Sequence, residues 1–114
     1  MKNAVKIFKA LSDPSRLRIL GMLQIRPLCV CEIKAILPLA LSTVSKHLSI
    51  LREAGLISDV KEQKWVVYHI ETESPDRMIR DLLSSLDRWL ADDAQIRADR
   101  NRVRTLDRHR LCQT

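Results

Sequence analysis

The apolar positions of the first half of the chain recur at helical spacing in four short segments. Within each stripe the apolar positions recur after three or four residues, as expected when one face of a helix is buried. The stripes are Val5, Phe8 and Leu11; Leu17, Leu20 and Leu23; Ile33 with Ile36 and Leu37; and Val44, Leu48 and Leu51. They predict helices over about residues 3–11, 14–24, 30–37 and 43–54.

Residues that start and stop helices stand at the ends of these segments. Asp13 is suited to cap the second helix, with Pro14 at the first helical position, where a missing N–H costs nothing. Ser42 is the capping candidate for the fourth helix, and Gly55 is suited to end it. Two short helices joined by a short turn are typical of a helix-turn-helix motif.

The second half begins with a β pattern and then returns to a helical one. The β-rich runs 56–60 and 65–70 flank a polar tip and predict a hairpin. Because the tip lacks Asn-Gly or Asp-Gly, we expect a longer, mobile loop. From Pro75 a broad apolar stripe predicts a last helix, and this stripe fades beyond about Ala94. The predicted fold class is mainly α with a β-hairpin, in the element order of a winged helix-turn-helix.

In that architecture the second helix of the motif enters the major groove of DNA. Serine, threonine and lysine side chains on such a helix can reach base edges or phosphates. Lysines at the hairpin tip either contact phosphates or remain solvated. The candidate DNA-binding residues are Ser42, Thr43, Ser45, Lys46, His47, Arg52, Lys61 and Lys64.

Charge supports a nucleic-acid partner. The 114 residues fit one domain and carry a net charge of +6, with six arginines and two aspartates in residues 97–114. We divide the chain into a DNA-binding and dimerisation domain, 1–96, and an Arg-rich helix extension or tail, 97–114. The tail either contacts phosphates or is solvated. Neither a signal peptide nor an apolar run of about 20 residues occurs, so we expect a cytoplasmic protein without a membrane partner.

Three cysteines carry the remaining chemistry. Cys29 and Cys31 precede the predicted recognition helix, and Cys112 lies near the C-terminus. An odd number of cysteines in the cytosol favours free thiols, whose thiolates are soft metal ligands. On a regular helix, positions i and i+2 point about 200° apart. One ion can therefore join both sulfurs only if residues 29–31 are non-helical, and we expect binding to unwind the start of the third helix.

Three motifs resemble the ArsR/SmtB family of metal-responsive repressors. The segment 11–20 resembles the family's second-helix signature, and 42–56 resembles its recognition helix and exit. The segment 28–32, Leu-Cys-Val-Cys-Glu, resembles the arsenic-site motif of arsenical-responsive members. The resemblance implies a homodimer, paired through the first and last helices, that leaves palindromic double-stranded operator DNA when metal binds. The apolar stripe of the last helix independently favours such a partner.

The resemblance also implies trivalent arsenic or antimony as inducer, with about three sulfur ligands and no organic cofactor. Many relatives with this motif have a third cysteine where this chain has Lys34. Cys112, from its own or the partner subunit, is the candidate third ligand. Otherwise water or a small thiol completes the site, and Cys112 is an inert thiol.

Other functions remain open. A repressor of this type can sense cadmium, lead or zinc, or the thiol redox state through a disulfide to Cys112. Catalysis is not expected, since the chain has neither a Cys-x5-Arg loop after Cys29 nor a glycine-rich anion cradle.

Overall fold

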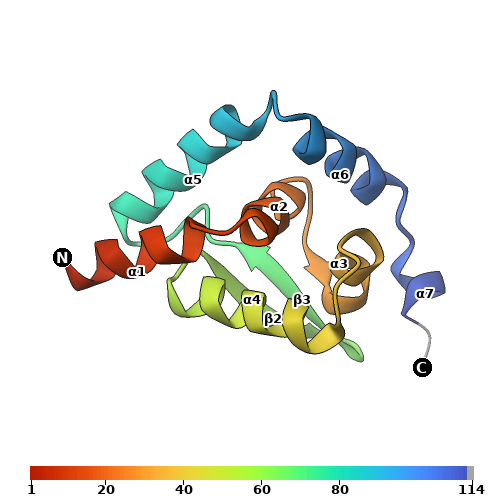
Figure 1. Ribbon diagram of the computed structural model, residues 1–114. Coiled ribbons are helices and arrows are strands. Elements are labelled where there is room, and N and C mark those ends of the chain that lie inside the picture. The colour runs from red at the N-terminus through yellow and green to blue at the C-terminus, as the bar shows by residue number, and fades with distance from the viewer. Residues whose placement is uncertain (113–114) are drawn as a thin grey trace.

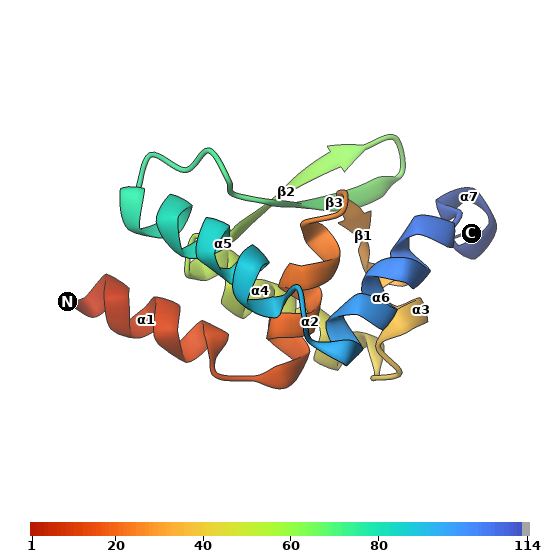
Figure 2. The same ribbon diagram turned by 90° about the horizontal axis from the view of Figure 1, so that it is seen from above.

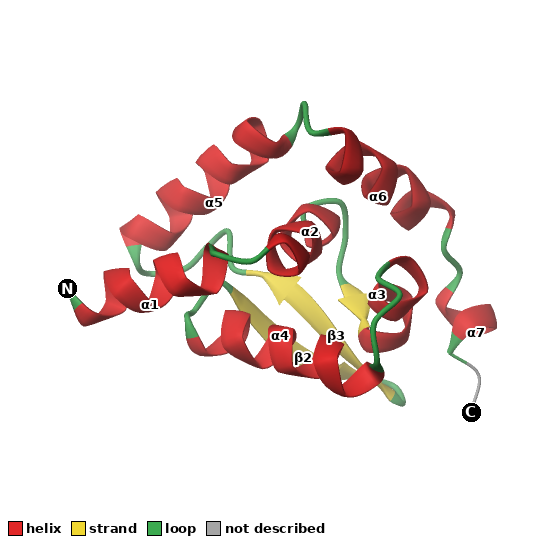
Figure 3. Ribbon diagram, in the orientation of Figure 1, coloured by secondary structure: helices red, strands yellow, loops and turns green. Residues whose placement is uncertain are grey.

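Helix α2 lies at the centre of the molecule, with the other helices around it (Figure 1). The computed structural model describes residues 1–112. Its elements are α1 (Lys2–Leu11), α2 (Pro14–Leu23), β1 (Leu28–Cys29), α3 (Val30–Ile36), α4 (Leu41–Glu53), β2 (Ile57–Glu62), β3 (Trp65–Ile70), α5 (Arg77–Leu90), α6 (Ala94–Thr105) and α7 (Arg108–Leu111). Helices lie over one face of the sheet, with α2 and α4 in front of the strands in Figure 3. In residues 1–112 no helix has the length and apolarity needed to cross a bilayer.

The four predicted helices and the hairpin are present, which confirms the winged helix-turn-helix class. Asp13 caps α2 as expected, because its Oδ2 accepts the N–H of Arg16 at 3.1 Å, and Pro14 takes the first helical position. The cap predicted at Ser42 is wrong. Helix α4 begins at Leu41, with Ala40 as its N-cap and no side-chain hydrogen bond there.

The sheet has a third strand that the apolar pattern did not predict. β1 consists of Leu28 and Cys29 and pairs antiparallel with β3, giving the strand order β1-β3-β2. Leu28 lies opposite Tyr68, and Cys29 lies opposite Val67. Both β1 residues are buried, so the start of α3 is fixed against the sheet.

The hairpin turn is shorter than expected. Glu62 pairs with Trp65, which leaves a turn of two residues, and the prediction of a longer loop is wrong. Gln63 has a φ of 57°, the left-handed conformation that a two-residue hairpin turn requires. The turn therefore forms without the Asn-Gly or Asp-Gly sequence that usually marks it.

The chain bends sharply beyond α5 instead of extending the predicted last helix (Figure 1). Helix α6 lies along α2 and α3 (Figure 2). Asp99, which is 1% exposed, accepts two hydrogen bonds from Arg18, at 2.8 and 2.9 Å. A Cβ on Gly21 would lie 3.1 Å from the Ile96 side chain, so glycine lets the two helices approach closely. The boundary that we placed at residue 96 thus falls inside a packed helix.

Gly55 follows α4 with a φ of 81° and completes a Schellman ending, in which the N–H of Leu56 donates to the carbonyl of Leu51 at 3.1 Å. A Cβ at Gly55 would also lie 2.9 Å from Ile79 Cδ1. We expect Gly55→Ala to lower the free energy of unfolding by about 1–2 kcal/mol. Gln63→Gly removes the side chain of a residue with positive φ and should raise the free energy of unfolding by roughly 0.5 kcal/mol. Urea unfolding measures both changes in the free energy of unfolding. Equal unfolding midpoints for the wild type, Gly55→Ala and Gln63→Gly would contradict this account.

Candidate functional site

Cys29 and Cys31 lie side by side at the junction of β1 and α3. Cys29 is the N-cap of α3, with an extended backbone (φ −90°, ψ 169°), and Cys31 lies in the first turn. Their Sγ atoms are 3.3 Å apart. Cys29 thus has the non-helical backbone that the sequence analysis required for this approach, and the two sulfurs meet here with α3 intact from Val30. Cys29 precedes the helix, so the 200° separation of helical positions does not apply to it.

Cys112 joins this pair from the same chain. Helix α6 passes α2 and α3, and the C-terminal segment (residues 106–112) that follows it brings the Cys112 Sγ to 3.2 Å from the Cys29 Sγ. Cys31 and Cys112 are paired as a disulfide, with their Cα atoms 5.9 Å apart. The three sulfurs form one group, called here the sulfur cluster, within 4.8 Å of one another. The structure thus brings together all three cysteines singled out in the sequence.

The sulfur cluster is enclosed by protein. Cys29 and Cys112 are 3% and 5% exposed, and Cys31 is half-buried. In residues 1–112 no histidine or carboxylate joins the three sulfurs as a fourth ligand. Burial raises the pKa of the Cys29 thiol. Three reduced thiols in this arrangement suit a thiophilic ion that takes three sulfur ligands, whereas zinc normally takes four ligands.

A buried carboxylate, which the sequence analysis did not single out, lies behind the cluster. Glu32 is fully buried, and its Oε1 accepts hydrogen bonds from the N–H of Cys29 at 3.0 Å and from Arg108 Nε at 2.8 Å. Arg26 Nη2 forms an ion pair with the other oxygen at 2.9 Å. Burial alone would raise the pKa of Glu32, but these partners outweigh it and hold the pKa below its ordinary value. The signal for Glu32 was its position three residues after an N-cap, as in a capping box.

Trp65, at the start of β3, contacts the C-terminal segment and was also missed. Its indole N–H donates to the carbonyl of Cys112 at 3.3 Å. The His109 ring meets the Trp65 ring edge-on, with centroids 4.9 Å apart, and the Arg108 guanidinium lies 5.6 Å from the Trp65 centroid. The residues that carry the third sulfur therefore lie against the tip of the hairpin, next to its turn.

The candidate DNA-binding residues lie on two elements. Ser42, Thr43, Ser45 and Lys46 are exposed on α4, Lys61 is exposed near the end of β2, and Lys64 is exposed in the hairpin turn.

Two further candidates on α4 also make contacts inside the chain. His47 is half-buried, with its Nδ1 3.2 Å from Arg16 Nη1, and so connects α4 to α2. Arg52 forms an ion pair with Asp59 of β2 at 3.2 Å. Both side chains thus help to fix the position of α4 relative to α2 and β2.

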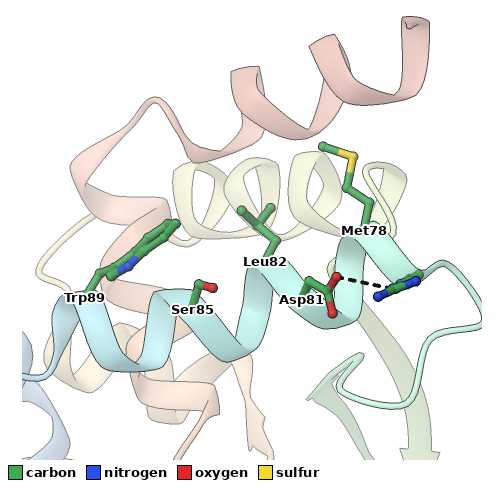
Figure 4. A pocket seen from close by; sticks show the side chains of 6 residues that line it. Met78, Asp81, Leu82, Ser85 and Trp89 are labelled. Carbon is green, nitrogen blue, oxygen red and sulfur yellow. Dashed lines mark ion pairs between the residues drawn. The ribbon is translucent and has the colours of Figure 1, made fainter.

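An exposed apolar surface covers parts of α1 and α5. Val5 and Phe8, two of the positions that predicted α1, are 47% and 55% exposed, and Trp89 of α5 is 64% exposed. Figure 4 shows Met78, Leu82 and Trp89 along one side of α5, facing α1. We call Val5, Phe8, Met78, Leu82 and Trp89 the α1/α5 face. Several large apolar side chains grouped in this way are typical of a protein–protein contact.

Comparisons with known proteins agree with this fold. Residues 13–59 match the model of the bacterial regulatory protein arsR family. Arsenic resistance transcriptional regulator ArsR1 of Pseudomonas putida is 37% identical over 77% of this chain and 72% of its own length. The cadmium resistance transcriptional regulatory protein CadC homolog of Staphylococcus aureus is 35% identical over 68% of this chain and 64% of its own length.

A solved structure has the same architecture. It is a homodimeric winged helix-turn-helix DNA-binding domain from Mycobacterium bovis, which superimposes with a TM-score of 0.63 at 26% identity and covers 82% of this chain and 86% of its own. Sequence motifs, fold and relatives agree. The chain belongs to the arsR family of bacterial regulatory proteins and is a DNA-binding transcriptional regulator, not an enzyme.

Proposed function

We propose that the chain is a repressor that releases its operator when trivalent arsenic or antimony binds Cys29, Cys31 and Cys112. The observation that carries this proposal is the sulfur cluster, three cysteine sulfurs of one chain within 4.8 Å of one another. Trivalent arsenic suits such a set because it forms three bonds to soft sulfur donors. Arsenous acid has three hydroxyl groups, and each As–S bond forms as one hydroxyl leaves with a thiol proton as water.

The repressor acts as a homodimer on double-stranded operator DNA. The α1/α5 face is the dimer interface, which is supported by its exposed aromatic side chains and by the homodimeric relative of the same fold. Two copies of α4 then present Thr43, Ser45 and Lys46 to half-sites about one helical turn apart.

The sulfur cluster is connected to the DNA-binding elements by direct contacts. Cys31 lies in α3, which packs against α4, and the backbone of Cys112 is hydrogen-bonded to Trp65 at the tip of the hairpin. An ion that changes the relative positions of the three sulfurs therefore acts on both elements. It shifts the equilibrium only as far as it prefers the released state over the DNA-bound state.

A second candidate function is thiol-redox sensing, and a specific observation favours it. Cys31 and Cys112 are already paired as a disulfide in this structure. Sensing of cadmium is the other alternative, because relatives named for cadmium resistance also match the chain. The three functions differ in which agent releases the operator.

The proposal predicts that arsenite releases a fluorescent operator duplex, selected in vitro from a random pool, from the reduced wild-type protein. Cys29→Ser and Cys31→Ser should bind the duplex normally but need about 100-fold more arsenite, because losing one of three As–S bonds costs about 3 kcal/mol or more. Fluorescence anisotropy measures both quantities. Wild-type sensitivity in these two variants would overturn the proposal, and release by cadmium but not arsenite would assign the site to the other metal.

A further inference from the structure

The C-terminal segment reaches the sulfur cluster as a short stretch with little regular secondary structure. Helix α6 ends at Thr105, the following residue is extended, and α7 spans only Arg108–Leu111. Such a short helix is not stable alone, so its position depends on tertiary contacts. The geometry that places Cys112 beside Cys29 must therefore be set by specific anchors.

Those anchors centre on Glu32. Arg108 of α7 donates from Nε to Glu32 Oε1 at 2.8 Å and from Nη2 to the carbonyl of Pro27 at 3.3 Å. Arg26 pairs with Glu32 and also donates to the carbonyls of Val103 and Leu106, at 3.3 and 3.2 Å. The buried Glu32 carboxylate thus binds two arginines. Arg26 contacts the end of α6, and Arg108 is the first residue of α7.

We propose that Glu32 and Arg108 are positioning residues that present Cys112 as the third ligand of the sulfur cluster. Glu32 and Cys31 lie in the same turn of α3. The anchor that holds Cys112 and the thiol of Cys31 therefore belong to one rigid element. Without the carboxylate, two guanidinium groups would face each other around a neutral side chain, and α7 would lose its ionic anchor. The site would then keep two sulfurs, Cys29 and Cys31. The inference rests on the proposed function, but its first test does not use arsenite.

Arg110 provides a matched control. It lies in the same short helix as Arg108 and carries the same charge. It is exposed, and no hydrogen bond or ion pair of its side chain occurs within residues 1–112. Arg108→Gln and Arg110→Gln therefore remove equal charge from neighbouring positions, and only the first removes the contact with Glu32.

The first test measures how often Cys112 lies beside Cys31 without any metal. In a Cys29→Ser background, a glutathione redox buffer gives the equilibrium constant for the Cys31–Cys112 disulfide, which reports the effective concentration of the two thiols. We expect Arg108→Gln and Glu32→Gln to lower this constant about tenfold or more and Arg110→Gln to leave it unchanged. An unchanged constant in Arg108→Gln overturns the inference, even if Glu32→Gln fails to fold.

The second test counts sulfur ligands. With all three cysteines present and reduced, X-ray absorption of bound arsenic should show three sulfurs in the wild type and in Arg110→Gln, but two in Arg108→Gln. In a Cys112→Ser background, Arg108→Gln should cause no further loss of arsenite affinity, since the residue it positions is already gone. Three sulfurs in Arg108→Gln, or additive losses, contradict the inference. A wild type that binds no arsenite refutes the proposed function instead, and the disulfide equilibrium still decides the role of Arg108.

Discussion

Phe8→Glu is expected to turn the proposed dimer into a monomer and to lower operator affinity by about 1,000-fold. Phe8 lies on the α1/α5 face and is 55% exposed in the single chain, so the substitution leaves the core intact. In a two-fold interface each change occurs twice, and an uncompensated carboxylate is costly to bury. Once the dimer is lost, the second half-site no longer binds at high effective concentration, a benefit of roughly 100- to 10,000-fold.

Lys6→Gln is the matched control for this variant. Lys6 lies on the same helix, is exposed, and its substitution changes the charge of the chain by the same amount as Phe8→Glu. Sedimentation equilibrium gives the dimer dissociation constant and anisotropy gives operator affinity, both at one salt concentration. If Phe8→Glu stays dimeric and binds like Lys6→Gln, the interface lies elsewhere on the chain.

The part of the fold that sequence predicted best rests on local signals. Asp13 and Pro14 mark the start of α2, and Gly55 marks the end of α4, because capping and left-handed backbone depend on residues a few positions apart. Even there the start of α4 was misplaced. Ala40 caps the helix with its backbone alone, which leaves no side-chain signal to detect.

The parts that were missed depend on long-range contacts. Strand β1 has two residues and exists only because Cys29 and its neighbour pair with β3. Helix α6 lacks a broad apolar stripe, since an ionic contact between Asp99 and Arg18, 81 positions apart, takes part of that role. No spacing rule reports such a contact.

The candidate site divides in the same way. Cys29 and Cys31 stand in a recognisable motif, and their chemistry follows from residue type. Whether Cys112 joins them depends on the bend of the chain after α5 and on the anchor at Glu32, two features that no local pattern encodes. The sequence left open whether Cys112 of either subunit, water or a small thiol takes the third position, whereas the fold brings the Cys112 sulfur of the same chain beside Cys29.

Oxidation by one equivalent of diamide is expected to abolish the arsenite response while leaving operator binding intact. Cys31 and Cys112 give up two electrons and two protons, which diamide takes up, and become a disulfide. One thiol then remains, Cys29, which is 3% exposed. A single thiolate cannot supply the three bonds that trivalent arsenic requires. Operator affinity should persist because the disulfide-paired structure described above already has α4 and the hairpin arranged as a winged helix-turn-helix.

This experiment also separates the two candidate functions. A metalloid sensor, once oxidised, holds its operator with or without arsenite, and its titratable thiols fall from three to one. A redox sensor releases the operator on oxidation alone, before arsenite is added.

Tris(2-carboxyethyl)phosphine should restore the arsenite response, and it supplies no competing thiol. Cys112→Ser serves as the control, because its two remaining cysteines are separated by one residue and form only a strained disulfide. Diamide should therefore leave the weaker arsenite response of that variant unchanged, and loss of that response would show that the oxidant acts outside the Cys31–Cys112 pair.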